Sequence, residues 1–246
     1  MNLYGLIGYP LTHSFSQQYF TQKFEREGIM DCIYKNFPIT SINEFPALLK
    51  ANFLKGLNVT IPYKEQVLQY VTSLSDDVKI IGAANTIIIS GDNLFAYNTD
   101  VIGFEKSFTN LIKPDHKRAL VLGTGGASKA VQFVLKKLDI EYLLVSRSDS
   151  ANGNLINYDQ LTRVIMKQYP VIINCTPSGM SPADNNCPDI PYHFITPDHY
   201  VFDLIYKPAK TLLLKKAEEQ GAAIKNGYDM LIIQAEESWK LWNTHS

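Results

Sequence analysis

The sequence lacks several features that mark broad classes of protein. Its three cysteines, Cys32, Cys175 and Cys187, have neither the even number of a disulfide framework nor the spacing of metal ligands. A formal net charge of −1 provides no basic surface for nucleic acid. No apolar run approaches the roughly twenty residues of a membrane span, and no cationic segment marks a secretory signal. These absences predict a reduced, cytoplasmic protein with a small-molecule partner, no metal site and no nucleic-acid or membrane partner.

The chain is long and apolar enough to hold more than one core. It has 246 residues, of which 46% are hydrophobic, which fits one large α/β domain or two smaller ones, and we expect two. Short apolar runs alternate with amphipathic stretches, a pattern typical of strands that reach parallel neighbours through helices. The predicted strands form two sets, 3–8, 33–39, 56–61 and 85–89, then 119–123, 142–146, 171–175 and 200–206.

Two helices are predicted at positions that matter for domain organisation. The segment 98–115 lies between the two sets of strands, and Thr99 or Asp100 could cap a helix that ends before Pro114. The final segment, 228–242, has apolar residues at helical spacing and predicts a docked amphipathic helix. Periodicity leaves open which domain that helix joins.

The segment "ALVLGTGGASKAVQFVLKKL", 119–138, runs from a strand through glycines into a helix. Gly123, Gly125 and Gly126 allow a tight turn and a close approach of the backbone to a pyrophosphate, which the helix N-terminus attracts. Ser128 stands where the usual dinucleotide pattern has its third glycine. The order of strand, turn and helix favours a dinucleotide site, and the alternative is an ordinary tight turn.

The end of the next strand, "SRS", bears on the choice of dinucleotide. The planar guanidinium of Arg147 can hold a phosphate through two hydrogen bonds, and Ser146 and Ser148 add hydroxyl groups. An arginine here favours NADP over NAD. Asp149 follows and no second basic residue is close, so a solvated arginine in a turn stays the alternative.

Four segments of the first part of the chain place polar side chains directly after apolar runs: "GYPLTHSFS", "GLNVTIPYKE", "GAANTIII" and "YNTDVIGF". Ligands bind beyond the carboxyl ends of strands in open α/β sheets. Taken singly, each polar residue could be a helix cap, a turn residue or a solvated lysine; together they predict a pocket for a small polyhydroxylated ligand. Lys64 and Asp100 are the groups best suited to proton transfer, and a hydride carrier beside them indicates a carbonyl/alcohol oxidoreductase.

These motifs resemble those of the shikimate dehydrogenase family over nearly the whole chain. The resemblance rests on the four polar segments, on "GTGGASKA", and on "INCTPSGM", "DLIYKP" and "NGYDMLIIQA". It implies an α/β protein of two hinged domains: a discontinuous substrate-binding domain, 1–100 and 226–246, and a Rossmann-type NADP-binding domain, 101–225. It also implies the reversible, NADPH-dependent reduction of 3-dehydroshikimate to shikimate, on the route to chorismate and the aromatic amino acids.

The resemblance assigns roles to individual residues. Lys64 is expected to give or take the proton at the reacting oxygen, with Asp100 hydrogen-bonded in the same cluster. The substrate carboxylate is expected at Ser14, Ser16, Tyr206 and Gln234, and the ring hydroxyls at Asn58, Thr60, Asn85 and Asp100. The cofactor is expected at Gly123, Thr124, Gly125, Gly126, Ala127, Ser146, Arg147, Ser148, Thr176, Pro177, Leu204, Gly227 and Met230.

Some features depart from the family pattern or leave alternatives open. Gln17 follows Ser16 where the family usually has proline, which bears on the carboxylate clamp. The single arginine after the second strand of the cofactor domain keeps an NAD-preferring quinate/shikimate dehydrogenase as an alternative. A non-catalytic homologue that binds shikimate or dinucleotide for regulation is a third possibility, although Lys64 and Asp100 are both present. The sequence is compatible with a monomer or a homodimer.

Overall fold

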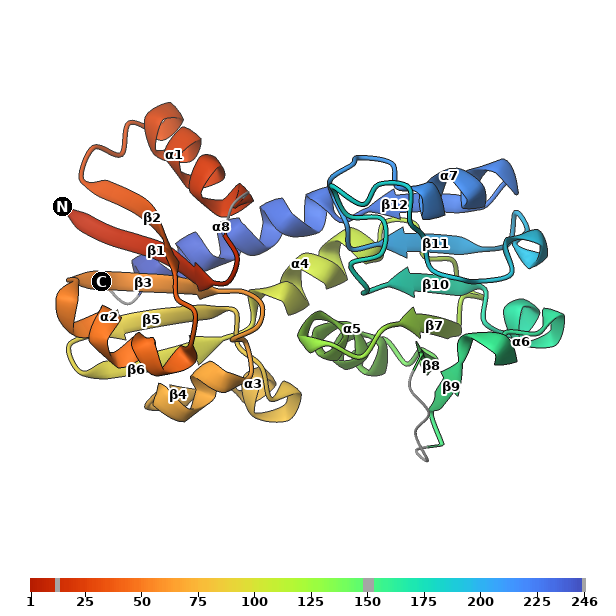
Figure 1. Cartoon of the computed structure of the whole chain (residues 1–246), viewed down its shortest axis with the longest axis horizontal. Coiled ribbons are helices and arrows are strands. Elements are labelled where there is room, and N and C mark those ends of the chain that lie inside the picture. Colours follow the sequence, from red (N-terminus) through yellow and green to blue (C-terminus); the bar gives the residue numbers. More distant parts are fainter. Residues whose placement is uncertain (12–13, 148–152, 245–246) are drawn as a thin grey trace. The chain divides into compact units, whose positions relative to one another are not determined.

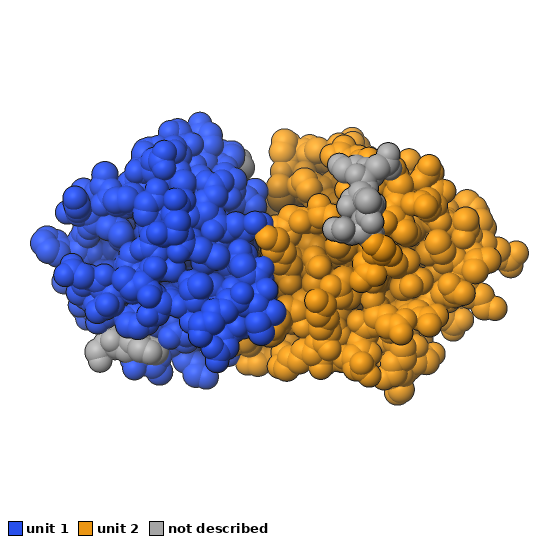
Figure 2. All heavy atoms as spheres, turned by 90° about the horizontal axis from the view of Figure 1, so that it is seen from below, with its two compact units in different colours: residues 1–99, 235–246 blue, residues 100–234 orange. Residues whose placement is uncertain are grey.

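The computed structural model describes residues 1–11, 14–147 and 153–244, and it divides into two compact units. Unit 1 comprises residues 1–99 and 235–246, and unit 2 comprises residues 100–234 (Figure 2). Among the residues that the structure describes, each unit contains one six-stranded sheet. The first set of predicted strands lies in the sheet of unit 1 and the second set in the sheet of unit 2.

The sheet of unit 1 has the strand order β2-β1-β3-β5-β6-β4. Its strands are β1 (Asn2–Gly8), β2 (Cys32–Pro38), β3 (Leu54–Val59), β4 (Ser73–Leu74), β5 (Thr86–Ser90) and β6 (Asn93–Tyr97). The strands β1, β2 and β3 are parallel, but β5 is antiparallel to both β3 and β6. The expectation of parallel neighbours is therefore wrong here. The chain reverses in a two-residue turn in which Gly91 has φ 57°, so β6, which was not predicted, pairs directly with β5.

Both faces of this sheet are buried. Neighbouring residues of each strand point to opposite sides of the sheet, and each side has its own core. Ile7 and Ile87 belong to a core with the short helices, whereas Leu6 and Ile88 face a core that contains Phe20 of α1 (Phe15–Glu27) and Trp242 of α8 (Tyr228–Thr244). An ion pair of 2.8 Å between Lys23 and Glu236 also joins α1 to α8. The helices of this unit are α1 (Phe15–Glu27), α2 (Phe45–Ala51), α3 (Asp76–Ile81) and the end of α8 (Tyr228–Thr244), with 3-10 turns at Ile42–Glu44 and Gln66–Tyr70 (Figure 1).

The sheet of unit 2 is entirely parallel, with the order β12-β11-β10-β7-β8-β9. Its strands are β7 (Arg118–Leu122), β8 (Glu141–Ser146), β9 (Leu155–Asn157), β10 (Val171–Asn174), β11 (Tyr200–Asp203) and β12 (Ala223–Asn226). From β7 the chain builds outward through β8 and β9, then returns to β10 on the other side of β7. This is the doubly wound order, and its switch point, where a ligand is expected, lies between β7 and β10.

Helices cover both faces of the unit 2 sheet. On α4 (Thr99–Phe108), the ring centroid of Phe104 lies 5.2 Å from that of Phe202, and the ring centroid of Phe108 lies 5.5 Å from that of Tyr200. Val201, between those two strand residues, faces the opposite core, to which α7 (Leu212–Glu219) contributes. The helices are α4 (Thr99–Phe108), α5 (Gly126–Lys137), α6 (Arg163–Gln168), α7 (Leu212–Glu219) and the beginning of α8, with 3-10 turns at Tyr158–Gln160 and Tyr192–Phe194. The described part of the chain has no helix long and apolar enough to cross a membrane.

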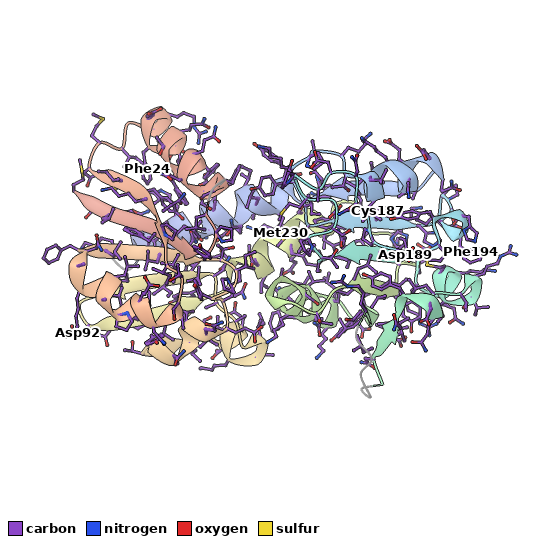
Figure 3. The ribbon with its side chains drawn as sticks, in the orientation of Figure 1. Phe24, Asp92, Cys187, Asp189, Phe194 and Met230 are labelled. Carbon is purple, nitrogen blue, oxygen red and sulfur yellow. The ribbon has the colours of Figure 1, made fainter. Side chains whose placement is uncertain are left out.

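The two predicted helices at the domain boundaries are present as α4 and α8. The division between the units falls at the start of α4 and inside α8, between Gln234 and Ala235. In unit 2, α4 and α8 pack closely, because a Cβ atom at Gly103 would lie 2.6 Å from the carbonyl oxygen of Met230 (Figure 3). A glycine at position 103 therefore allows the two helix backbones to approach.

Candidate active site

Five buried polar residues meet at the strand ends of unit 1, and we call them the strand-end network: Asn58, Asn85, Thr86, Thr99 and Ser238. None is more than 5% exposed. They come from the end of β3, the start of β5, the start of α4 and the middle of α8. The network brings together Asn58 and Asn85, two of the residues predicted to face the ring hydroxyls.

The carboxamide of Asn58 is held by protein groups. Its nitrogen donates to Ser238 Oγ at 3.0 Å and lies 3.2 Å from Thr86 Oγ1, while its oxygen accepts from the Tyr34 hydroxyl at 2.8 Å. Buried amides are stable only when such partners satisfy them. Asn58 therefore joins three strands and α8 from inside the unit.

Asn85 is fixed both by its side chain and by its backbone. Its side-chain oxygen accepts from the Thr99 backbone N–H at 2.7 Å, and its own N–H donates to Tyr97 O at 3.0 Å. The Asn98 side chain donates to Ala83 O at 2.8 Å. The loop "GAAN" is thereby joined to the last residues before α4.

Lys64 lies half-buried on a turn beside that loop. Its carbonyl oxygen accepts from Ala84 N–H at 2.8 Å, and Tyr63 N–H donates to Thr60 O at 2.9 Å. The Tyr63 hydroxyl donates to Ile39 O at 2.7 Å, so the turn is anchored on both sides of the lysine. Thr60 is half-buried and packs so closely on Gly8 that a Cβ there would lie 2.4 Å from its methyl group. The backbone at Lys64 is therefore bonded to the residue that precedes Asn85 of the strand-end network.

The two serines predicted to hold the substrate carboxylate begin α1. Ser14 is the N-cap, and its hydroxyl accepts from Gln17 N–H at 3.4 Å. Ser16 is half-buried in the first turn. Burial raises the pKa of Tyr34, while a hydrogen bond with Ser16 opposes that rise. Because the same Tyr34 hydroxyl contacts Asn58, Ser16 is connected to the strand-end network.

Sequence reasoning missed Tyr34, Thr86 and Ser238 in this unit. Thr86 stood in a quoted motif but was treated as part of a strand. Ser238 follows Gln234 by one helical turn, between the apolar positions that define the docked face of the last helix, so its place on a buried face was a usable signal. Tyr34 lies inside an apolar run, where its hydroxyl gives no pattern.

In unit 2 the glycine turn lies at the switch point of the sheet. Gly123 has φ 96°, and a Cβ atom there would lie 2.9 Å from Thr176 Cγ2, so the ends of β7 and β10 approach one another through this glycine. The N-cap of α5 is Gly125, which has no side chain to accept from the first-turn N–H groups, and a Cβ atom there would meet nothing within 4 Å. Thr124 is exposed, and Gly126 and Ala127 are half-buried. Open space before unpaired backbone donors fits a phosphate group.

Thr176 is oriented by a buried carboxylate. Its N–H and hydroxyl donate to the Asn174 side-chain oxygen at 3.0 and 2.7 Å, and the Asn174 amide donates to Asp203 at 3.0 Å. Thr211 and the Ile205 N–H also donate to Asp203, at 2.6 and 3.1 Å. Burial raises the pKa of Asp203 to about 6, against the opposing effect of these hydrogen bonds. Asn174, Asp203 and Thr211 were not predicted, although the first two belong to quoted motifs.

The other predicted cofactor residues lie around the carboxyl ends of the neighbouring strands. A Cβ atom at Gly227 would lie 2.0 Å from Leu204 O, so glycine lets the start of α8 pass the end of β11. Met230 is buried, Leu204 is half-buried and Pro177 is exposed. At the end of β8, Ser146 is half-buried and Arg147 is exposed, near enough to Tyr158 to oppose the rise in its pKa that burial causes. Ser148 lies outside the described residues.

Three predicted substrate residues belong to unit 2. Asp100 is buried in the first turn of α4 with 6% exposure. Gln234 and Tyr206 are half-buried, and burial raises the pKa of Tyr206. The remaining predicted substrate residues are in unit 1, so the set is divided between the two units. Within the described ranges, no group of three or more His, Cys, Asp or Glu side chains could hold a metal ion.

Comparison with known proteins identifies the family. Residues 6–87 match the model of the shikimate dehydrogenase substrate binding domain. The chain is 38% identical to the shikimate dehydrogenase (NADP(+)) of Aquifex aeolicus, over 98% of this chain and 91% of that protein. It is 34% identical to the shikimate dehydrogenase (NADP(+)) of Pyrococcus abyssi, over 98% of this chain and 92% of that protein.

Solved structures agree with this result along the whole chain. The crystal structure of shikimate dehydrogenase from Aquifex aeolicus has a TM-score of 0.88 at 34% identity, covering 99% of this chain and 93% of that one. Shikimate 5-dehydrogenase from Thermus thermophilus, in complex with NADP(H) and shikimate, has a TM-score of 0.86 at 27% identity, covering 98% and 93%. With this identity over nearly the full length of its relatives, the chain belongs to the shikimate dehydrogenase family.

Proposed function

We propose that this protein is an NADP-dependent shikimate dehydrogenase, which reversibly reduces 3-dehydroshikimate to shikimate on the route to chorismate. The observation that carries the proposal is the match over 98% of the chain to proteins named shikimate dehydrogenase (NADP(+)). The polar strand ends of unit 1 and the glycine turn of unit 2 supply the two kinds of site that this reaction needs. A cytoplasmic enzyme, as monomer or homodimer, is consistent with this role.

The two units take different parts in the proposal. Unit 1 contains the residues that match the substrate-binding model, and we assign substrate binding to it. The doubly wound unit 2 binds NADP, with the backbone of Gly123 to Ala127 at the pyrophosphate and with Ser146 and Arg147 at the adenosine phosphate. Thr176, Pro177, Leu204, Gly227 and Met230 line the path to the nicotinamide. When bound, the dinucleotide supplies or accepts the hydride.

Lys64 manages the proton in this proposal. Conversion of a ketone to an alcohol adds one hydride to carbon and one proton to oxygen, so a group that donates a proton at that oxygen completes the balance. The backbone of the turn that carries Lys64 is fixed by hydrogen bonds to Thr60 on one side and to Ala84 on the other, which supports this role. In this proposal Asp100 is hydrogen-bonded in the cluster of groups that Lys64 forms around the reacting oxygen.

The remaining polar residues orient the substrate. Ser14, Ser16, Tyr206 and Gln234 hold the carboxylate, and Asn58, Thr60, Asn85 and Asp100 bind the ring hydroxyls. Two of these residues are themselves held inside the protein: Asn58 is 5% exposed and bonded to Tyr34, Thr86 and Ser238, and Asn85 is 3% exposed and bonded to Thr99. Hydroxyl and amide groups fixed by other hydrogen bonds suit a rigid polyhydroxylated ring.

The test is an assay with two cofactors and two acids. Initial rates of cofactor reduction with NADP+ or NAD+, each with shikimate or quinate, give four values of kcat/KM. We expect the pair NADP+ and shikimate to give the highest value. A clear preference for NAD+ with quinate would indicate a quinate dehydrogenase. Tight binding of shikimate in calorimetry with no turnover under any condition would indicate a regulatory homologue.

A further inference from the structure

Ser238 occupies a junction in unit 1 to which the proposed reaction assigns no part. It lies on α8, one helical turn after Gln234, and its side chain is fully buried. Its hydroxyl oxygen is 3.0 Å from Asn58 Nδ2, 2.8 Å from Thr86 Oγ1 and 3.1 Å from Thr99 Oγ1. One hydroxyl thus touches the end of β3, the start of β5 and the first residue of α4.

The chemistry of these contacts fixes their direction in part. An amide nitrogen only donates, so Ser238 accepts from Asn58 and can share its own proton with one threonine. Hydrogen bonds in a buried network strengthen one another and rigidify their surroundings. Removal of this one oxygen therefore affects three elements together.

The contact with Thr99 leads to the residues that face the substrate. The Thr99 N–H and hydroxyl both donate to the Asn85 side-chain oxygen, at 2.7 and 3.2 Å. Thr99 is also the residue before Asp100, at the beginning of α4. A shift of Thr99 would turn the Asn85 carboxamide and move the backbone that carries Asp100.

We infer that Ser238 is a positioning residue for the shikimate reaction: through Thr99 and Asn58 it holds the Asn85 carboxamide and the first turn of α4 in the geometry that binds the ring hydroxyls. This inference rests on the proposed function. Ser238 acts through its neighbours, since its side chain has no exposure to solvent. It makes the C-terminal helix part of the apparatus that orients the substrate.

A second residue of α8 offers a matched control. Trp242 lies one turn further along the helix and is 2% exposed, and its indole N–H donates to Ile87 O of β5 at 3.0 Å. The substitution Trp242→Phe removes one hydrogen bond between the same helix and the same strand, together with part of a ring that packs on Tyr4 and Phe20, at a residue outside the strand-end network. A purely structural role for Ser238 predicts that both substitutions have similar consequences.

The experiment compares Ser238→Ala, Trp242→Phe, Thr99→Val and the double variant Ser238→Ala/Thr99→Val by steady-state kinetics and thermal unfolding. We expect Ser238→Ala to lower kcat/KM for shikimate about tenfold, because small misplacements of binding groups cost up to about a hundredfold. KM for NADP+ should stay unchanged. Trp242→Phe should lower Tm by at least as much as Ser238→Ala and leave kcat/KM for shikimate within about twofold. Ser238→Cys, with weaker hydrogen bonds at similar size, should fall between wild type and alanine.

The double variant tests the path through Thr99. If Ser238 acts through the Thr99 hydroxyl, the loss in the double variant is clearly smaller than the product of the two single losses. Losses that multiply, or equal kinetic effects of Ser238→Ala and Trp242→Phe, overturn the positioning role while wild-type activity stands. A wild-type protein that does not reduce NADP+ with shikimate overturns the proposed function itself, and the inference with it.

Discussion

The two sheets carry different chemical groups at the carboxyl ends of their central strands. In unit 1 amides and hydroxyls at the end of β3, at the start of β5 and after the end of β6 bond to one another, and the strand-end network is almost entirely buried. In unit 2 the end of β7 is followed by glycines, and the N-cap of α5 has no side chain. Both edges lie where open α/β sheets bind their ligands. One is built from fixed side chains and the other from backbone.

The difference matches two kinds of ligand. A ring with several hydroxyls is recognised by the directions of individual hydrogen bonds, so its site needs side chains that cannot rotate. A phosphate is recognised by charge and by close approach, which backbone N–H groups and the positive end of a helix provide. Unit 2 also has a rigid polar group, but it is buried: Asp203 holds Asn174, and Asn174 holds Thr176. The two regions should therefore respond differently to substitution and to pH.

The largest effect is expected in unit 1 at Lys64. Replacement by alanine removes the proposed proton donor, and loss of a general acid or base typically costs about 10² to 10⁴ in rate. We expect kcat with shikimate and NADP+ to fall about a thousandfold, while the Kd of shikimate measured by calorimetry changes by less than about fivefold. Lys55→Ala is the matched control, since that lysine is exposed on the same strand that leads to Lys64. Near-native turnover in Lys64→Ala would show that another group handles the proton.

The next effect concerns Asp203, the buried carboxylate of unit 2. Its pKa is raised from 3.8 to about 6 in the folded protein, chiefly by burial. Between these values the folded state binds more protons than the unfolded state. The contribution of Asp203 to stability is therefore fully present below pH 4 and is lost as the pH rises through 6. A shift of this size corresponds to roughly 3 kcal/mol in the free energy of unfolding.

The measurement compares urea unfolding of the wild type and Asp203→Asn from pH 4 to pH 7. Asparagine keeps an acceptor for Asn174 and Ile205, and the Thr211 hydroxyl can turn to accept from its amide. The difference in unfolding free energy between the two proteins should change by roughly 3 kcal/mol over that range in favour of the variant. The same difference for Ser238→Ala should be independent of pH, because the strand-end network has no ionisable member. Parallel profiles for wild type and Asp203→Asn would contradict the assignment.

The sequence predicted those features of the two units that local patterns encode. Apolar runs located most of the principal strands, and the order of strand, glycines and helix located the turn at Gly123. The hairpin of β5 and β6 was missed, because a run followed by Gly91 reads the same whether the chain crosses over or reverses. Fold class thus followed from the pattern, whereas strand direction depended on one short turn.

The sequence pointed to proposed site residues where they follow a strand, and it gave no sign of the residues that support them from inside the fold. Lys64, Asn85 and Thr176 stood in polar segments after apolar runs. Ser238 and Tyr34 lie inside amphipathic or apolar stretches, where a single hydroxyl does not reveal that strands distant in sequence surround it. Asp203 belonged to a quoted motif, but the motif does not reveal that this carboxylate is fully buried. Nor does it reveal that Asp203 orients Thr176 through Asn174. Supporting residues depend on tertiary packing, which periodicity does not record.

The smallest effect is expected at Arg147, an exposed side chain at the otherwise backbone-built edge of unit 2. If its guanidinium binds the adenosine phosphate, Arg147→Ala should lower kcat/KM for NADP+ about thirtyfold, as expected for a charged, bidentate contact. The value for NAD+, which lacks that phosphate, should stay the same. Arg118 provides the control, because it is also exposed but begins β7 at the opposite end of the sheet, paired with Glu141 at 2.8 Å. Arg118→Ala should leave both values unchanged. An equal loss with NADP+ and NAD+ in Arg147→Ala would mean that the arginine supports the edge as a whole, and that side chains as well as backbone build the cofactor site.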